Sequence, residues 1–435
     1  MKTFWYFLLL ILSKVFYKVI RFLKISDGTS LIGLIVLKLD KNFLKQSSKY
    51  INRIITVTGT NGKTTTSGLI SHILEKNKFK VLSNTEGANM ITGIANAFAV
   101  KINPFKKPDF AVLESDEAYL AKLYNELSAD YLVVTNLFRD QLDRYGELNT
   151  TAKKIQNAID ENPKLKLILN ADDPLVANLK SKNENIYYGI NKIEYCFDEP
   201  ESKAPQEMIN CPVCKKELEY SEKFYAQEGH YYCSCGYKRP NCKYNADVLI
   251  YENFSIIRLF VDDKVYELKT KLTGLYNVYN VLASVTLCFE LGITDFQRAL
   301  DDYSPEFGRN EIRKISGKQV LIQLIKNPTG ASEVLRTITP DSDILIAIND
   351  NYADGRDVSW LWDSDFEELQ RCHKKIVVTG TRAKDMAIRL KYAEVKNFSV
   401  IPNIDKAIKK ITKEADSKVT ILTTYTALLH INKHK

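Results

Sequence analysis

The sequence predicts an α/β protein with a parallel-rich sheet, a small cysteine-rich insertion and a second α/β domain at its C-terminal end. Apolar, β-branched runs alternate with helical segments along most of the 435 residues, which favours a parallel sheet covered on both faces. A glycine-containing loop at 59–66 joins a strong strand to a helix. Six of the eight cysteines fall between residues 196 and 242, which indicates a compact insertion. At roughly 150 residues per domain, the length predicts two or three domains.

The composition excludes several classes of protein. Hydrophobic residues make up 45% and charged residues 26% of the chain, as in an average globular protein. A wholly disordered chain, a collagen-like fibre and a multi-span membrane protein are therefore excluded. The 61 basic and 53 acidic residues leave a net charge of +8, which mildly favours phosphates or acidic lipid as partners but does not require nucleic acid.

The N-terminal segment combines an apolar run at 4–12 with basic residues. The run is too short for a spanning helix, and no small-residue cleavage site is evident after Ser13. Lys14, Lys18 and Arg21 are spaced by four and three, so on a helix they form one basic stripe. We expect this helix to lie on the inner membrane face. The alternatives are a helix that packs on the protein or a partner, and a spanning anchor.

Residues 59–66, Gly-Thr-Asn-Gly-Lys-Thr-Thr-Thr, form a candidate phosphate loop. A buried strand is predicted at 53–58 and a helix at 67–76, which is the context that such a loop requires. Two glycines let the backbone turn and approach phosphates, which backbone N–H groups and the helix N-terminus then bind. The loop residues that we expect to bind the nucleotide are Gly59, Thr60, Asn61, Gly62, Lys63, Thr64 and Thr65.

Two residues of this loop have more specific expected roles. Lys63 is placed to reach the β- and γ-phosphates, as a catalytic residue, and Thr64 to ligate Mg²⁺. Val57 stands where the general G-x-x-x-x-G-K-[ST] pattern has its first glycine. The shortened loop resembles the ATP-binding loop of the Mur ligases and folylpolyglutamate synthetases. These enzymes activate a carboxylate as an acyl phosphate, which an amine then attacks.

Further segments follow in the order of the Mur ligase family. A predicted strand at 110–113 leads into acidic residues. The first of them, Glu114, matches the family glutamate that holds magnesium, and we expect it to be catalytic. The strand at 131–135 leads into a segment that resembles the family's T-N-x-x-x-D-H-L-D motif, with Gln141 in place of the histidine. Ligands bind at the carboxyl ends of parallel strands. The residues that we expect to converge there are Gly59, Glu114, Asn136 and Asn170.

Two later segments resemble nucleotide-binding motifs of the same family. Asn277 and Asn280 match the G-x-x-N-x-x-N motif that begins at Gly274, and the resemblance implies contact with the adenine side of the nucleotide. Their spacing places them on one helical face, where capping or a polar surface is the alternative. Arg309 resembles the family's linker arginine, which meets the nucleotide phosphates.

The cysteine cluster has the spacing of a zinc ribbon. Cys211 and Cys214 form one knuckle, and Cys233 and Cys235 form a second one after an 18-residue gap. Four thiolates close a tetrahedral zinc site and leave no open position, so we expect structural zinc in a reducing cytosol. The segment between and around the knuckles is rich in aromatic residues, and we expect it to be either an insertion held together by the metal or a docking surface. The fallback ligands are Cys196, Cys242 and His230.

The C-terminal part contains an acidic loop at 349–365 that follows a predicted strand. Together with the cysteine insertion, IKNPTG at 325–330 and TGTRA at 379–383, this loop narrows the resemblance to an amidating branch of the Mur ligases. The resemblance implies that Asp357 completes the Cys–His pair of a glutaminase partner, where it would orient the imidazole. The alternatives for this role are Asp354 and Asp350.

The resemblance implies a carbon–nitrogen ligase of peptidoglycan synthesis. ATP would convert the α-carboxylate of D-glutamate in the lipid II stem peptide to an acyl phosphate, and ammonia would then give D-isoglutamine. The ammonia would come from a GatD-type glutaminase, since neither Cys288 nor Cys372 lies in a nucleophile elbow. The implied cofactors are ATP, Mg²⁺ and structural Zn²⁺, with no nucleic acid. The expected location is the cytoplasmic face of the cell membrane.

These expectations divide the chain into three parts. We expect a membrane-proximal helical segment at 1–47, a Mur-ligase-type central ATP-binding domain at 48–304 with the ribbon insert at about 196–245, and an α/β domain that contacts the glutaminase at 305–435. The 58 residues before Gly59 leave no room for a UDP-precursor domain, which favours a lipid-linked substrate. The alternatives are a ligase that adds an amino acid and an ATP-driven module that binds nucleic acid, for which no recognition motif is apparent.

Overall fold

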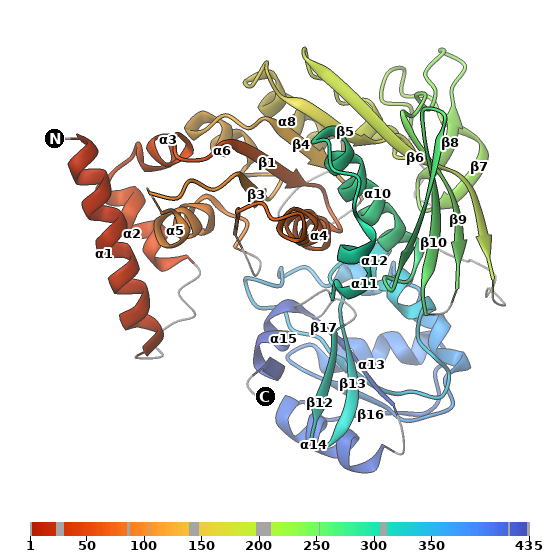
Figure 1. Ribbon diagram of the computed structural model, residues 1–435. Coiled ribbons are helices and arrows are strands. Elements are labelled where there is room, and N and C mark those ends of the chain that lie inside the picture. The colour runs from red at the N-terminus through yellow and green to blue at the C-terminus, as the bar shows by residue number, and fades with distance from the viewer. Residues whose placement is uncertain are drawn as a thin grey trace. The chain divides into compact units, whose positions relative to one another are not determined.

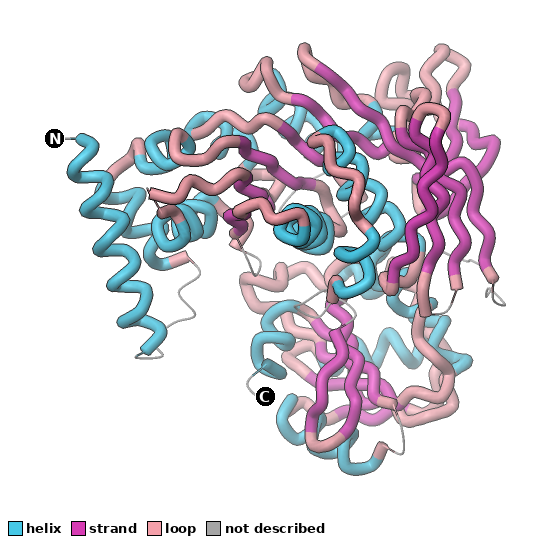
Figure 2. Tube along the Cα trace, in the orientation of Figure 1, coloured by secondary structure: helices cyan, strands magenta, loops and turns pink. Residues whose placement is uncertain are grey.

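The computed structural model forms two compact units, each with its own sheet. The first unit contains the N-terminal helices, the phosphate loop and the cysteine insertion, and the second contains the C-terminal strands. Figure 1 shows the two sheets, and Figure 2 shows how helices and strands alternate along the chain. The structure describes residues 2–22, 30–84, 88–103, 105–138, 148–196, 210–251, 253–304, 311–415 and 418–432.

The sheet of the first unit has nine strands in the order β11-β10-β9-β6-β5-β4-β1-β3-β2. The seven strands β9, β6, β5, β4, β1, β3 and β2 pair in parallel, as predicted. Strand β10 pairs antiparallel with β9, and β11 pairs antiparallel with β10 at the edge of the sheet. The strand bounds are β1 (Arg53–Thr58), β2 (Val81–Ser83), β3 (Phe110–Glu114), β4 (Tyr131–Val134), β5 (Lys166–Asn170), β6 (Glu184–Tyr195), β9 (Tyr244–Ile250), β10 (Ser255–Val261) and β11 (Lys264–Thr270).

Two helices that pack on each other line the part of the sheet that carries the phosphate loop. These are α4 (Lys63–Lys76), which contacts β1, β2 and β3, and α10 (Leu275–Glu290), which contacts β5 and β6. The helix after the loop begins at Lys63 rather than at the predicted residue 67, because Gly62 with φ of +82° ends the loop and serves as the N-cap. The other helices of this part are α6 (Leu120–Glu126), α8 (Leu148–Asp160), α9 (Pro174–Ala177) and α11 (Gln297–Asp302).

The N-terminal helix packs on the rest of the first unit through one face. This helix, α1 (Lys2–Phe22), contacts α2 (Leu31–Leu39) and α5 (Ile91–Lys101), and α3 (Phe43–Ser48) also contacts α5 (Figure 1). Tyr6 donates to Ser47 at 3.1 Å, and Lys14 donates to the Ile102 carbonyl at 2.7 Å, so Lys14 turns toward the protein. The face of α1 that carries Tyr6 and Lys14 therefore packs on the protein, which was the alternative to a helix bound to the membrane. Within the described ranges, no helix is both long and apolar enough to cross a bilayer.

The second unit has a six-stranded sheet in the order β12-β13-β17-β14-β15-β16, in which only the β12–β13 pair is antiparallel. Successive side chains of β14 enter opposite cores: Ile344 and Ile346 belong to one buried cluster, and Leu345 belongs to the other. The strands are β12 (Glu311–Ile315), β13 (Lys318–Leu324), β14 (Asp343–Ala347), β15 (Ile376–Thr379), β16 (Phe398–Val400) and β17 (Val419–Thr423). The helices are α12 (Pro328–Arg336), η1 (Ser359–Leu361), η2 (Phe366–Arg371), α13 (Ala383–Tyr392), α14 (Ile404–Glu414) and α15 (Tyr425–Ile431).

Candidate active site and metal centre

The phosphate loop lies between β1 and α4 and needs glycine at two positions. Gly59 has a φ of +128°, and a Cβ there would lie 2.2 Å from Thr135 Oγ1. Gly62 has a φ of +82°, and its Cβ would lie 2.0 Å from Asn280 Oδ1. Since other residues rarely adopt these φ values, any side chain at these positions would both strain the backbone and displace a neighbour.

The segment after β4 holds the loop in place through backbone hydrogen bonds. Thr60 N donates to the Asn136 carbonyl at 2.9 Å, and Asn61 N donates to Asn136 Oδ1 at 2.8 Å. Thr135 Oγ1 donates to the Asn61 carbonyl at 2.7 Å. Asn136 was expected at this edge of the sheet, and its backbone and its side chain both reach the loop. The loop is thus shaped by contacts that are independent of a bound nucleotide.

The Lys63 side chain is buried and paired with a carboxylate that sequence reasoning did not single out. Its ammonium group lies 3.2 Å from Glu117 Oε1 and also donates to the carbonyls of Gly59 and Thr60. Glu117 is itself 5% exposed. The run of acids at 114–117 was the available signal, but only its first residue matches a family motif. Glu117 therefore balances the charge of the buried Lys63 ammonium group.

Thr64 and Glu114, the residues predicted to hold magnesium, lie together. Thr64 Oγ1 donates to Glu114 Oε2 at 2.6 Å. Glu114 ends β3 and is buried, and its other carboxylate oxygen accepts from Asn89 Nδ2 at 3.3 Å. Asn84 Oδ1 accepts from Glu114 N at 2.9 Å, which fixes the end of the strand. A hydroxyl and a carboxylate oxygen at this spacing suit a hard cation such as Mg²⁺.

Asn277 and Asn280 share a face of α10, as their spacing predicts. Asn280 Nδ2 donates to Asn277 Oδ1 at 3.3 Å, and Thr66 Oγ1 donates to Asn280 Oδ1 at 3.3 Å. Asn280 therefore lies against the start of α4, and Asn277 lies next to it with its amide donating to the Thr273 carbonyl. The backbone of Thr65 accepts from the Tyr303 hydroxyl at 3.2 Å. Arg309 and Gln141 lie outside the described residues.

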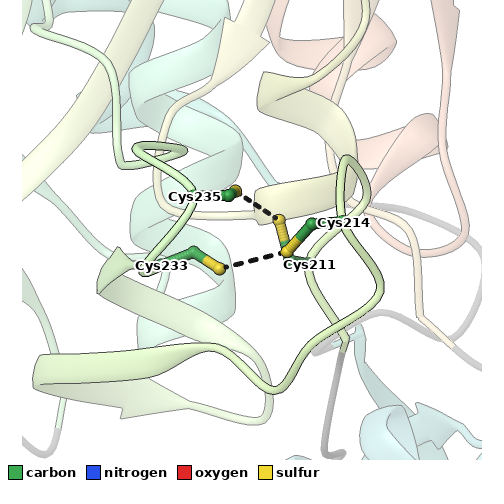
Figure 3. Close-up of side chains that lie close together, drawn as sticks. All are labelled: Cys211, Cys214, Cys233 and Cys235. Atoms are coloured by element: carbon green, nitrogen blue, oxygen red, sulfur yellow. Dashed lines mark hydrogen bonds between the residues drawn. The ribbon is translucent and has the colours of Figure 1, made fainter.

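The four predicted zinc ligands converge, as Figure 3 shows. Their sulfur atoms all lie within 4.8 Å of one another, with Cys211 and Cys235 at 3.6 Å and Cys214 and Cys233 at 3.5 Å. Zn–S bonds of about 2.3 Å in a tetrahedron imply S···S distances of about 3.8 Å, so the donor set fits zinc. A hydrogen bond from the Cys235 backbone N–H lowers the pKa of the Cys233 thiol to about 7. In Cys235 the hydrogen bond from the Tyr237 backbone acts in the same direction, but burial and the three neighbouring thiols outweigh it and raise this pKa to about 12.

The fallback ligands lie outside this group. His230 Nε2 is 2.8 Å from the Ile190 carbonyl, and Cys242 Sγ contacts the Pro240 carbonyl at 3.8 Å. The ribbon's two strands, β7 (Glu219–Tyr225) and β8 (Glu228–Tyr232), form an antiparallel hairpin between the knuckles. Tyr231 is buried and stacks on Tyr237, with ring centroids 5.6 Å apart. Part of the aromatic content of the insertion therefore forms its own core.

In the second unit, the three candidate aspartates of the acidic loop at 349–365 differ from one another in their contacts. The buried Asp354 carboxylate accepts from Thr426 N at 2.6 Å and from the Thr426 hydroxyl, which ties the loop to α15. Asp350 accepts from Arg382 at 3.1 Å. Burial would raise the pKa of Asp350, but hydrogen bonds from Thr381 and Arg382 outweigh it and lower this pKa. Trp360 of the same loop is buried, whereas Trp362 is 51% exposed.

Asp357 is engaged only locally within the described part of the chain. Its Oδ1 accepts one hydrogen bond, from Ser359 N at 2.8 Å, and the residue is half-buried. Unlike the carboxylates of Asp350 and Asp354, that of Asp357 makes no hydrogen bond to another of the segments that the structure describes.

Comparisons with known proteins agree with this architecture. A model of the Mur ligase middle domain matches residues 57–288, and a model of the MurT ligase C-terminal domain matches residues 324–428. The chain is 37% identical over 409 residues, covering 92% of this chain and 91% of the relative, to "Lipid II isoglutaminyl synthase (glutamine-hydrolyzing) subunit MurT" of Staphylococcus aureus (strain COL). The protein of the same name from Streptococcus pneumoniae (strain ATCC BAA-255 / R6) is 35% identical, covering 94% and 93%.

Solved structures share the fold at low sequence identity. A pseudomurein peptide ligase type C from Methanothermus fervidus superposes with a TM-score of 0.68 at 24% identity, covering 88% of this chain and 79% of that one. Folylpolyglutamate synthase from Thermotoga maritima gives a TM-score of 0.61 at 13% identity, covering 96% of each chain. The two domain models match, and the two MurT relatives are 35% to 37% identical over more than nine-tenths of both chains. The chain therefore belongs to the MurT family of Mur ligases.

Proposed function

We propose that this ligase uses ATP to amidate the α-carboxylate of D-glutamate in the lipid II stem peptide. The match to proteins named as MurT subunits of a lipid II isoglutaminyl synthase, over nine-tenths of both chains, carries this proposal. The phosphate loop supports it, since its glycines and buried lysine have the geometry of a nucleotide site. Residues 48–304 would form the catalytic domain, and residues 305–435 the partner-binding domain.

The chain's own residues support a phosphoryl-transfer step. The loop N–H groups and the N-terminus of α4 would bind the phosphates, and Lys63 would move from Glu117 to the β- and γ-phosphate oxygens. Thr64 and Glu114 would hold Mg²⁺, which neutralises phosphate charge when bound. A substrate carboxylate oxygen bonds to the γ-phosphorus as ADP leaves. Ammonia then bonds to the acyl carbon, phosphate leaves, and the nitrogen loses a proton.

A glutaminase partner of the GatD type would supply the ammonia. The relatives are named as subunits, and their name includes glutamine hydrolysis. Asp357 is the best candidate to complete the partner's Cys–His pair, because Asp354 and Asp350 are held within the unit by α15 and Arg382. A carboxylate hydrogen-bonded to a histidine fixes its tautomer and stabilises the imidazolium.

Peripheral contact with the cytoplasmic membrane face also belongs to this proposal. The face of α1 that points away from α5 exposes a continuous set of apolar side chains: Phe4, Ile11, Leu12, Val15, Val19 and Phe22. Such a face, next to the exposed Lys18 on the same helix, suits insertion among anionic headgroups. Co-sedimentation with phosphatidylglycerol vesicles should fall when Ile11 and Val15 are changed to Ser. Equal sedimentation of variant and wild type would exclude this face.

A reconstituted reaction tests the proposed function. The chain and its glutaminase are mixed with ATP, glutamine and a lipid-linked muropeptide, and the stem peptide is analysed by mass spectrometry. We expect the mass change from carboxyl to carboxamide on D-glutamate, with one ADP formed per amide. Omission of ATP should abolish the product, whereas ammonium salts should replace glutamine and partner. An unmodified stem peptide, or incorporation of an amino acid instead of ammonia, would contradict the proposal.

A further inference from the structure

The tip of the ribbon hairpin reaches the carboxyl edge of the large sheet with polar side chains that are fully buried. Gln227 and Glu228, at the turn between β7 and β8, are 0% and 1% exposed. Long polar side chains are rarely buried without a specific partner, because their desolvation must be offset by hydrogen bonds. The cysteine knuckles lie at the opposite end of this hairpin, so they do not explain the polar tip.

Gln227 contacts the segment that follows β4. Its Nε2 donates to the Leu137 carbonyl at 2.5 Å and to Asp173 Oδ2 at 3.1 Å. Asp173 Oδ2 in turn accepts from Leu137 N at 2.8 Å. Both backbone polar groups of Leu137 are therefore held, one by the ribbon and one by an aspartate that the ribbon also contacts. Leu137 directly follows Asn136, whose backbone and side chain bind the phosphate loop at Thr60 and Asn61.

A second chain of hydrogen bonds runs parallel to the first. Glu228 Oε1 accepts from Asn170 Nδ2 at 2.9 Å, and the same amide donates to the Thr135 carbonyl at 3.4 Å. Thr135 Oγ1 donates to the Asn61 carbonyl in the phosphate loop at 2.7 Å. Gly229 N also donates to the Asp172 carbonyl at 3.0 Å, which joins the hairpin to the loop after β5.

From this arrangement we infer that the ribbon is a positioning element for the phosphate loop, with Gln227 and Glu228 as its positioning residues. The ribbon hairpin would keep residues 135–137 in the one arrangement that presents Thr60 and Asn61 correctly. The cysteine knuckles would act indirectly, by closing the base of the hairpin whose tip makes the contacts. This inference rests on the proposed nucleotide site and adds a residue set outside the motifs of that site.

The test compares Gln227→Met with Ser221→Ala in the full-length chain. Methionine is unbranched and close to glutamine in size but lacks the amide donor, so Leu137 O and Asp173 lose one hydrogen bond each. Ser221 is on the same hairpin, and its hydroxyl donates to the His230 carbonyl in the neighbouring strand at 3.2 Å. Zinc content is measured in both variants, and each should retain the metal of the wild type.

Two measurements give the readout. Calorimetric titration with a non-hydrolysable ATP analogue should show about tenfold weaker binding to Gln227→Met, the order expected for a buried hydrogen bond lost, and no change for Ser221→Ala. Hydrogen exchange of the unliganded chain should be faster in peptides covering 59–66 in Gln227→Met, while peptides covering β10 and β11 stay at the wild-type rate.

The possible outcomes separate this inference from the proposed function. If the wild type fails to bind the analogue, the nucleotide site itself is wrong. If the wild type binds and Gln227→Met matches it in affinity and in loop exchange, the positioning role is overturned while the nucleotide site stands. Uniformly faster exchange, with the phosphate loop affected no more than β10 and β11, would show that Gln227 only stabilises the fold and would also overturn it.

Discussion

Replacing Lys63 with alanine should destabilise the protein as well as abolish ATP turnover. The ammonium group of Lys63 and the carboxylate of Glu117 lie 3.2 Å apart, and the two side chains are only 10% and 5% exposed. Removing one partner of a buried ion pair costs about 3 to 5 kcal/mol, because the remaining charge loses its counter-ion inside the protein. At about 2 to 4 °C per kcal/mol for a domain of this size, the melting temperature should fall by roughly 10 °C.

A double variant separates the structural role of Lys63 from its catalytic role. Lys63→Met combined with Glu117→Gln removes both charges while keeping similar volumes, so most of the lost stability should return. Turnover should stay absent, since no ammonium group is left to meet the phosphates. In Glu117→Gln alone, the triphosphate can take the place of the missing carboxylate, so ATP should raise the melting temperature by more than it does in the wild type.

Thermal unfolding followed by circular dichroism, with and without ATP, and a phosphate-release assay measure these effects. The reasoning is refuted if Lys63→Ala melts at the wild-type temperature, or if the double variant is no more stable than Lys63→Ala. Wild-type phosphate release by the double variant would remove Lys63 from the reaction.

Three further changes test other parts of the molecule. Asp357→Asn should suppress glutamine-driven amidation and largely spare amidation driven by ammonium, since only the partner's histidine would lose its carboxylate; wild-type rates with both nitrogen sources would exclude the role. Purified protein should contain about one zinc per chain, and elemental analysis should show its loss in Cys211→Ser but not in the control Cys196→Ser, which changes a cysteine outside the cluster. Gly33→Ala should cost about 1 to 3 kcal/mol in chemical denaturation, because its Cβ would lie 1.8 Å from a backbone carbonyl of α5. The exposed Leu34→Ala on the same helix should cost less, and the reverse order would contradict the close packing of α2 on α5.

Local sequence patterns predicted the parts of the fold that depend on local chemistry. Strand β1 was predicted from its apolar and β-branched residues and β3 from the apolar run at 110–113, because both faces of a central parallel strand are covered and favour such residues. The antiparallel strands β10 and β11 were missed. In β10 only alternate residues are buried, and nothing in such a pattern tells which neighbour the strand will choose.

The candidate site divides in the same way. The glycines of the phosphate loop and the four cysteines were predictable, since each set follows a spacing that the chemistry requires. The pairing of Thr64 with Glu114 was predictable from the family resemblance, which assigns both residues to magnesium. Glu117 and Gln227 were not, because a buried carboxylate or amide has no characteristic spacing. Arg309 remains a prediction from the family motif alone.

The sequence by itself determined the family, the alternating α/β pattern, the glycine-containing loop at 59–66 and the four cysteines that lie together in the insertion. Only the tertiary structure decided that Lys63 rests on Glu117, that the ribbon hairpin ends against Leu137, and that α1 buries one apolar face while leaving the other exposed. The physical reason is the separation in sequence between the residues that interact. Turns, caps and metal knuckles are set by residues a few positions apart, whereas a buried charge or amide is stable only beside a partner that the folded chain brings from far away in the sequence.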